Sequence, residues 1–278
     1  MKVTINDVAR HAGVSIKTVS RVMNNEPSVR KDTCDKVMAA INELQYQPNA
    51  AARNLASNRS FSIGYIYDNP NAYYVIDMQR GLLDACRKHG YELLIHPTNA
   101  KSPGIVQEVI DLVQQSRLAG LVLTPPFSEM PHIAEALESI GVHFVRIISG
   151  STPSPKLSNC VLVDDFTAAF KITTHLLELG HSDIAFLCGD EEHSSSGERL
   201  AGYQAALAKR GIAANPKFIV PGSYSFESGV KGATKLMELA KKPTAIFACN
   251  DEIAAGALFS ARLMNIAIPQ QLAIAGFE

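Results

Sequence analysis

The chain has 278 residues, of which 46% are hydrophobic and 19% charged, and this composition excludes an intrinsically disordered protein and predicts more than one folding unit. The formal net charge of −1 excludes a polyelectrolyte. Residues 1–60 nevertheless carry nine Lys or Arg against five Asp or Glu, an imbalance that favours an anionic partner for this segment.

The first 46 residues have the apolar spacing of three helices. Gly13 separates the first two helices, which Thr4 and Ser15 can cap, with Asp7 near the positive end of the first. Ser28 is a candidate cap of the third helix, which we expect to end before Pro48. The apolar positions are Ile5, Val8 and Ala9 in the first helix, Val14, Val19 and Val22 in the second, and Val37, Ile41 and Leu44 in the third.

From residue 61 onward, short apolar strands alternate with amphipathic helices. We expect strands at FSIGYIY, YELLIHP, GLVLTP, HFVRII, CVLVDD, IAFLCG, TAIFACN and LAIAGFE. This alternation predicts βαβ units and mainly parallel sheets. The Pro- and Ser-rich segment 149–159 interrupts it, and we interpret this segment as a surface loop near the division between two α/β lobes.

Ligands of open parallel sheets bind beyond the carboxyl ends of the strands, so the residues that follow each strand are the first candidates for a site. These segments are DNPNAYY, GDEEHSSSGER, GSYSF, ND and FE. No GxGxxG motif follows a strand and no GxxxxGK[ST] loop is present, so we expect no nucleotide cofactor.

The cysteines and the N-terminus predict a cytoplasmic location. The N-terminal MKVTINDVAR is polar from its start, and no apolar run approaches the roughly 20 residues needed to cross a bilayer. An odd number of widely spaced cysteines without a CxxC pair indicates free thiols, mostly in the core, in a reducing compartment. They are Cys34, Cys86, Cys160, Cys188 and Cys249.

The first two predicted helices fit a helix-turn-helix, although an ordinary amphipathic helical hairpin has similar spacing. In a helix-turn-helix the second helix lies in the major groove of DNA, with its early residues at the base edges. Here Ile16, Lys17 and Arg21 supply an apolar contact and two hydrogen-bond donors to the bases. The residues suited to phosphate contacts are Thr4, Ser15, Thr18, Ser20 and Asn24.

The run TINDVARHAGVSIKTVSRVMNN, followed by INELQYQPNAAARNLASNRS, closely resembles the headpiece and hinge of the lactose repressor/galactose repressor (LacI/GalR) family. The resemblance continues through GYELLIH, HLLELGHSDIAFLCG, ERLAGYQAAL and PTAIFACNDEIAAGAL to the final GFE. It implies an all-α helix-turn-helix headpiece (1–46), a hinge helix and linker (47–60), and an α/β two-lobed type I periplasmic-binding-protein-like domain (61–278). The first lobe would cover 61–158 and the second 159–278.

The resemblance also implies a homodimer on a pseudo-palindromic DNA operator. In the implied hinge helix, PNAAARNLAS, Asn49 contacts DNA and Leu55 wedges between base pairs of the minor groove. Without the family, Leu55 would be interpreted as a minor core residue. The pair Ile16-Lys17 lies at a position that varies within the family, so the operator sequence cannot be transferred from a relative.

For the larger domain, the resemblance implies two lobes that close on an effector, often a sugar or a nucleobase. Arg199 matches the arginine that grips the effector, although alone it would be interpreted as a surface residue at a helix start. Tyr73 and Tyr224 match aromatic residues that stack against the effector from opposite lobes. The other implied contacts are Tyr74, Asp164, His193, Ser195, Asn250 and Glu278, whereas Asp251 is placed to cap a helix.

The chain departs from the family pattern at two places. Many relatives have an aspartate where this chain has Ile148, with Arg146 two residues earlier, and this favours an anionic or less polar effector. Family members also continue beyond the final GFE, so we expect the C-terminal part of the second lobe to be missing here.

The sequence therefore predicts a sequence-specific transcriptional regulator, by analogy a repressor, whose operator affinity is controlled by a sugar-like molecule. A solute-uptake binding protein is the first alternative, but it needs a signal peptide and no headpiece. An α/β enzyme is the second alternative. Its carboxylate pairs Asp164-Asp165 and Glu191-Glu192 would point to opposite faces of a strand, and His175, His181 and His193 lack metal-ligand spacing. We expect no enzymatic activity, metal or cofactor, and no membrane partner.

Overall fold

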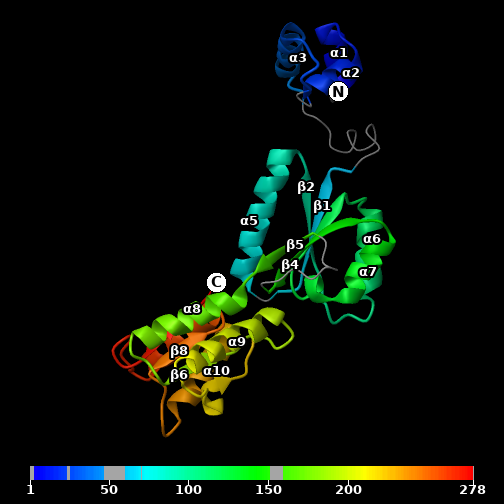
Figure 1. Cartoon of the computed structure of the whole chain (residues 1–278). Helices are drawn as coiled ribbons and strands as arrows, with labels where there is room; N and C mark the ends of the chain where they lie inside the picture. The colour runs from blue at the N-terminus through cyan, green and yellow to red at the C-terminus, as the bar shows by residue number, and fades with distance from the viewer. Residues whose placement is uncertain (1–2, 24–25, 47–59, 70, 151–158, 278) are drawn as a thin grey trace. The chain divides into compact units, whose positions relative to one another are not determined.

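The structure is a computed structural model that describes residues 3–23, 26–46, 60–69, 71–150 and 159–277. The chain divides into two compact units, Met1–Phe61 and Ser62–Glu278 (Figure 1). We call them the N-terminal unit and the C-terminal unit and describe each by itself.

The N-terminal unit holds three helices: α1 (Ile5–Ala12), α2 (Ile16–Met23) and α3 (Lys31–Glu43). Val8 and Val19 are fully buried together with Val37, so one small core joins all three. The Asp7 carboxylate accepts hydrogen bonds from the backbone N–H and the hydroxyl of Thr4, at 2.9 and 2.7 Å, and this confirms the predicted cap of α1.

The turn between α1 and α2 follows the prediction, whereas the start of α3 does not. Gly13 is left-handed at φ 67, and Ser15 Oγ accepts a hydrogen bond from the N–H of Thr18 at 3.1 Å. The cap position of α3 is Arg30 and not Ser28, and no side chain accepts a hydrogen bond there.

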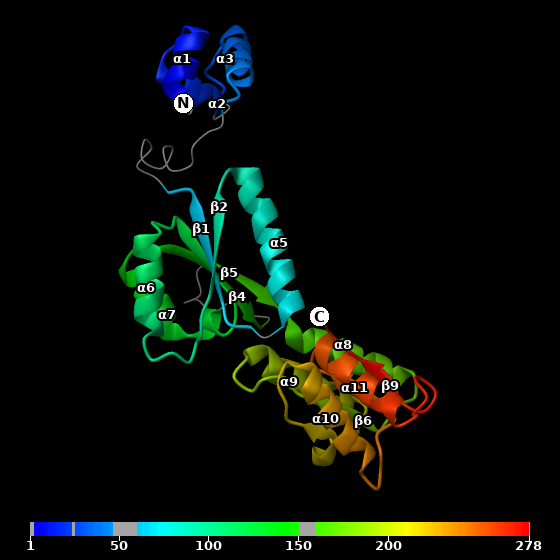
Figure 2. The ribbon, with the colours of Figure 1, turned by 180° about the vertical axis from the view of Figure 1, so that it is seen from behind.

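The C-terminal unit begins with a parallel five-stranded sheet of order β2-β1-β3-β4-β5. The long helix α5 covers one face and α6 and α7 cover the other (Figures 1 and 2). The strands are β1 (Ser62–Tyr67), β2 (Glu92–Pro97), β3 (Gly120–Leu123), β4 (His143–Ser149) and β5 (Cys160–Val163). The helices are α5 (Ala72–His89), α6 (Ile105–Gln115), the short 3₁₀ helix η1 (Phe127–Glu129) and α7 (Pro131–Ser139).

A second parallel sheet follows, with four strands in the order β7-β6-β8-β9. Every residue of β6 and β8 is buried, which explains why both are continuous apolar runs in the sequence. The strands are β6 (Ile184–Leu187), β7 (Ile219–Val220), β8 (Ala245–Ala248) and β9 (Ala273–Ala275). The helices are α8 (Asp165–Glu178), α9 (Ser194–Lys209), the 3₁₀ helix η2 (Pro216–Phe218), α10 (Phe226–Met237) and α11 (Asp251–Leu263).

Helix α8 packs closely against α9, and α10 packs closely against α11. Gly202 in α9 lies against the carbonyl of Phe166 in α8, and Gly256 in α11 lies against the carbonyl of Phe226 in α10. A side chain at either glycine would separate the two helices, so the absence of a Cβ sets how closely each pair packs.

One predicted boundary differs from the structure. The sequence places the strand at 160–163 in the second lobe, but this strand pairs in parallel with β4, from Arg146↔Cys160 to Ser149↔Val163. The Pro- and Ser-rich segment therefore separates two neighbouring strands of the first sheet, and the chain reaches the second sheet only through α8. We use "first lobe" for residues of the five-stranded sheet and its helices, and "second lobe" for the rest of the C-terminal unit.

All five cysteines are free thiols. None of the described helices is both long enough and apolar enough to cross a bilayer.

Candidate functional site

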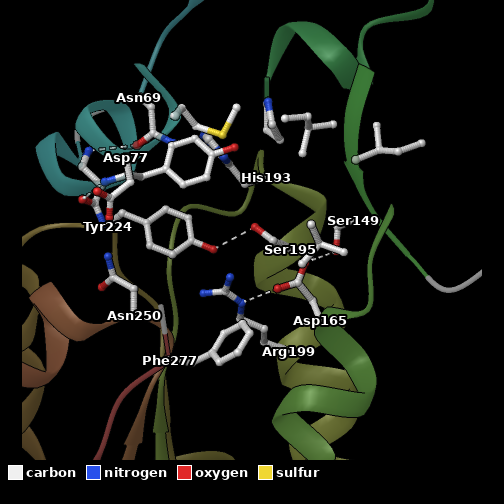
Figure 3. Close-up of a pocket in the computed structure, with 17 residues that line it drawn as sticks. Asn69, Asp77, Ser149, Asp165, His193, Ser195, Arg199, Tyr224, Asn250 and Phe277 are labelled. Carbon is white, nitrogen blue, oxygen red and sulfur yellow. Dashed lines mark hydrogen bonds and ion pairs between the residues drawn. The ribbon is translucent and has the colours of Figure 1, made fainter. Parts of the chain in front are cut away.

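A cavity of about 430 Å³ lies beyond the carboxyl ends of the strands and is lined from both lobes (Figure 3). The first lobe contributes residues that follow β1 and β3, the start of α5 and the ends of β4 and β5. The second lobe contributes the first residue of α8, the start of α9, and the segments that follow β7, β8 and β9. The cavity therefore lies at the edge where parallel sheets bind ligands.

Arg199 anchors the polar part of this cavity. Its Nε donates to Asp165 Oδ1 at 2.7 Å, and its Nη1 donates to the carbonyl of Cys249 at 2.5 Å. The hydroxyl of Ser149, at the end of β4, donates to the other oxygen of Asp165 at 2.5 Å. This chain of contacts links the first lobe to α8 and α9, and Figure 3 shows its side chains converging on the cavity.

Arg199 also makes a cation–π contact, because its guanidinium carbon lies 4.3 Å from the ring centroid of Phe277. The arginine side chain is only 14% exposed and that of Asp165 only 2%, so both charges are largely removed from water. The alternative interpretation of Arg199 as a surface residue is therefore wrong.

Tyr224 forms a second polar group in the cavity. Its hydroxyl lies 3.0 Å from Ser195 Oγ and accepts a weak hydrogen bond from the thiol of Cys249 at 3.5 Å. The ring of His193 meets the ring of Tyr224 edge to face, with centroids 5.6 Å apart. Burial raises the pKa of Tyr224, so this hydroxyl stays protonated and can donate to a ligand.

The aromatic residue that lines the cavity from the first lobe is Tyr74 and not Tyr73. The Asn71 side chain caps α5 by accepting from the N–H groups of Tyr73 and Tyr74, at 2.9 and 3.1 Å. Successive residues of a helix differ in direction by about 100°, so one tyrosine turns inward and its neighbour outward. Tyr74 lines the cavity, and burial together with nearby Tyr65 and Asp165 raises its pKa, whereas Tyr73 is 72% exposed.

A similar shift of one residue applies to the neighbouring carboxylates. Asp164 does not line the cavity; its side chain accepts a hydrogen bond from the N–H of Thr167 at 3.0 Å and caps α8. Asp165, the next residue, enters the cavity instead.

Asn250 lines the cavity and also caps α11, because its Oδ1 accepts from the N–H of Ile253 at 2.9 Å. Its buried Nδ2 has no hydrogen-bond partner among the described residues, so the amide retains a donor for a ligand. Asp251, expected to cap this helix, is its first residue instead.

The sequence predicts that Tyr74, His193, Ser195, Arg199, Tyr224 and Asn250 share one site, and all six line the cavity. The aliphatic residues of the cavity are not predictable in this way, because strand ends of Ile and Val are typical of any sheet core.

Ile148 is among the lining residues, whereas Arg146 is not. The Nε of Arg146 donates instead to the carbonyl of Ser128 at 2.5 Å. The lining residues that the sequence does not single out as contacts are Asn69, Asn71, Asp77, Met78, Pro125, Ile147, Ser149, Val163, Asp165 and Phe277.

The N-terminal unit presents a separate group of predicted residues at the start of α2. Ile16, Lys17 and Arg21 are exposed, whereas Val19 on the same helix is fully buried. The hydroxyl oxygens of Ser15 and Thr18 form a hydrogen bond at 2.9 Å, and the guanidinium of Arg21 forms an ion pair with the carboxylate of Glu26 at 3.4 Å. Thr4 is also exposed and Ser20 is half-buried. Asn24, Asn49, Leu55 and Glu278 are also predicted contacts and lie outside the described residues.

Within the described parts of the chain, no group of three or more His, Cys, Asp or Glu is arranged to hold a metal ion. The cavity offers hydroxyl, amide and guanidinium groups, which suit recognition of a neutral hydroxylated ligand.

Comparison with known protein families gives two matches. Residues 4–49 match the bacterial regulatory proteins of the lacI family. Residues 60–277 match the periplasmic binding proteins and sugar binding domain of the LacI family. The first match covers the three helices and the second covers both sheets.

Individual relatives span almost the whole chain. Catabolite control protein A of Priestia megaterium is 32% identical over 279 residues, which cover 100% of this chain and 83% of that protein. The transcriptional repressor PurR of Haemophilus influenzae is 31% identical over 277 residues, covering 99% and 81%.

Solved structures give the same picture. The lac repressor dimer bound to operator and the anti-inducer ONPF has a TM-score of 0.78 at 25% identity, covering 100% of this chain and 83% of that one. The transcriptional regulator CelR in complex with cellobiose has a TM-score of 0.68 at 25% identity, covering 99% and 82%.

Proposed function

The chain belongs to the LacI family of bacterial transcriptional regulators, and on this premise we propose that it is a repressor whose operator affinity is controlled by a sugar-like effector. DNA binding and effector binding are properties of the family. We assign these properties to particular residues of this chain.

On the DNA side, we assign base recognition to Ile16, Lys17 and Arg21. The observation that carries the proposal is that these three residues are exposed on one face of α2, while Val19 and Val22 are buried in the core on its other face. Thr4, Ser15, Thr18, Ser20, Asn24 and Asn49 would contact phosphates or sugars, and Leu55 would wedge into the minor groove.

We place the headpiece at residues 1–46, the hinge at 47–60 and the effector domain from residue 61. The lac repressor was solved as a dimer on its operator, and we propose that this chain likewise binds a pseudo-palindromic operator as a homodimer. A regulator of this kind works where the chromosome is, so we place the protein in the cytoplasm.

On the effector side, we assign polar contacts to Arg199, Asn250, Ser195 and Tyr224, with Tyr74 as the aromatic contact from the first lobe. The bound cellobiose of CelR supports a sugar-like ligand. An enzymatic role has weaker support, because glycoside hydrolysis uses two working carboxylates and the buried carboxylate of Asp165 is already paired with Arg199.

The test begins with selection of bound DNA from a random duplex pool by the whole chain. We expect a two-fold symmetric consensus whose affinity falls steeply with salt, because phosphate contacts release counterions. A screen for small molecules that release the selected duplex then follows. Equal binding to every duplex, or turnover of a candidate sugar, would refute the proposal.

A further inference from the structure

The cavity has an apolar wall, formed by Met78, Pro125, Ile147, Ile148 and Val163. The last three come from the ends of the neighbouring strands β4 and β5, where Ile148 pairs with Leu162 and Ser149 with Val163. In Figure 3, side chains that carry only carbon stand beside the green strands. Val163 is 39% exposed although it lines the cavity, so part of this wall remains for a ligand to cover.

The charges of the cavity are balanced. Arg199 is paired with Asp165 at 2.7 Å, and the other carboxylate of the lining, Asp77, lies 3.3 Å from Arg80. No lysine lines the cavity in the described part of the chain, and the one nearby surplus cation predicted from sequence, Arg146, is not among the lining residues. A phosphorylated or carboxylated ligand would therefore enter without an unpaired cation to meet it, which is costly in a partly buried site.

Polar residues line the cavity from both lobes, but the apolar wall belongs to the first lobe, whereas six polar lining residues belong to the second lobe. They include Ser195, Arg199, Tyr224 and Asn250, and Asn250 retains a buried donor without a partner among the described residues. A ligand that satisfies both parts needs hydroxyl groups at one end and an apolar group at the other.

We infer that the effector is an uncharged glycoside, in which a sugar ring meets the polar groups and an aryl or alkyl aglycone covers the wall of Ile147, Ile148 and Val163. This inference rests on the proposed function and adds the chemical class of the effector. The presence of Ile148 in place of the family's aspartate favours either an anionic or a less polar effector. The paired charges and the apolar wall of the cavity favour the less polar effector over the anionic one.

The test compares matched ligands on the whole chain by calorimetry. For each common hexose, the free sugar, its 4-nitrophenyl glycoside and its 6-phosphate are titrated. We expect the affinity for one glycoside to be at least about tenfold higher than the affinity for its own free sugar. Even a small apolar group provides a gain of this size when it fits an apolar pocket. The corresponding 6-phosphate should bind more weakly than the free sugar.

Two valines of the first sheet provide a matched pair of variants. Val163 and Val145 are exposed to nearly the same extent, 39% and 38%, but only Val163 lines the cavity. Val163→Thr should lower the glycoside affinity by about fivefold, because it places a hydroxyl against the aglycone. Val145→Thr should leave the glycoside affinity unchanged. Ile148→Asn should lower the glycoside affinity by more than Val163→Thr does.

The inference fails if no glycoside binds, if a free hexose, a 6-phosphate or a purine base binds more tightly, or if the two threonine variants behave alike. Binding to the selected operator is measured on every variant. Retained operator binding without a glycoside preference overturns this inference alone, whereas loss of operator binding by the unmodified chain overturns the proposed function.

Discussion

Arg199 illustrates how one side chain joins stability to ligand binding. It neutralises Asp165, which is only 2% exposed, and it contacts the Cys249 carbonyl and the Phe277 ring while facing the cavity. A buried carboxylate that loses its partner is far more costly than a buried pair that is removed together.

We therefore predict that Arg199→Ala lowers the free energy of unfolding by about 3–5 kcal/mol. The double variant Arg199→Ala/Asp165→Ala should be more stable than Arg199→Ala alone, because no unpaired charge remains. Urea unfolding measures both values. A double variant less stable than the single one would show that the ion pair is not the dominant interaction.

Lys17 and Thr18 are adjacent on α2 but have different predicted roles. Lys17→Ala should change the base preference at one operator position, with a discrimination of about 1–3 kcal/mol lost there. Thr18→Ala should lower the affinity for all DNA sequences to the same extent, because a contact with a phosphate does not distinguish one base from another. Binding to all single-base variants of the selected operator separates the two patterns, and identical profiles would contradict the groove assignment.

At the residue scale, the sequence predicted the chemistry of the cavity better than the identity of each residue. Tyr73 and Asp164, both predicted contacts, each lie one position before a residue that enters the cavity; Tyr74 was also predicted, whereas Asp165 was not. The difference depends on where the caps of α5 and α8 start each helix, which fixes the direction of every later side chain. Neighbouring residues of the same type cannot be distinguished from spacing alone.

At the scale of elements, the helix pairs of the second lobe depend on glycine. Gly256→Ala should destabilise the C-terminal unit by about 1–3 kcal/mol, because its Cβ would overlap the Phe226 carbonyl. Gly81→Ala is the matched control, since Gly81 lies within α5 and a methyl group added there would meet nothing within 4 Å. That control should be neutral or stabilise by up to about 1 kcal/mol. Equal effects on urea unfolding would contradict the packing account.

The predictable elements are those whose sequence pattern matches their burial. Strands β6 and β8 are buried at every residue, and their apolar runs predict them. Strand β7 has only two residues, Ile219 and Val220, which is too short to show any period. Strand β5 belongs to the first sheet because its backbone pairs with β4. The pattern of side chains along a strand does not indicate which strand will be its neighbour, so this pairing could not be predicted.

At the scale of the whole molecule, several buried acids with raised pKa values predict sensitivity to alkali. Burial raises the pKa of Tyr203 and Tyr224 above the ordinary tyrosine value and that of Cys188 to about 11. The unfolded chain releases these protons first as pH rises, so the folded state binds more protons there and becomes less stable.

The contribution of these three groups to the unfolding free energy should thus be steady below about pH 9 and should fall above it, by up to about 1.4 kcal/mol per pH unit for each group. Tyr203→Phe removes one such group, and although it loses the hydrogen bond to the Ile184 carbonyl at 2.8 Å, it should reduce the slope. Urea unfolding between about pH 8 and pH 11 measures the slope. An unchanged slope in the variant would contradict this origin.

The central claim is that ligand binding in the cavity controls DNA binding by a different part of the same chain. The most direct measurement is the operator dissociation constant of the whole chain with and without the selected effector, for the wild type and for Asn250→Ala. The account predicts a change of about 5- to 150-fold in the wild type and little change in the variant at the same effector concentration. An operator affinity that the bound effector leaves unchanged in the wild type would contradict it.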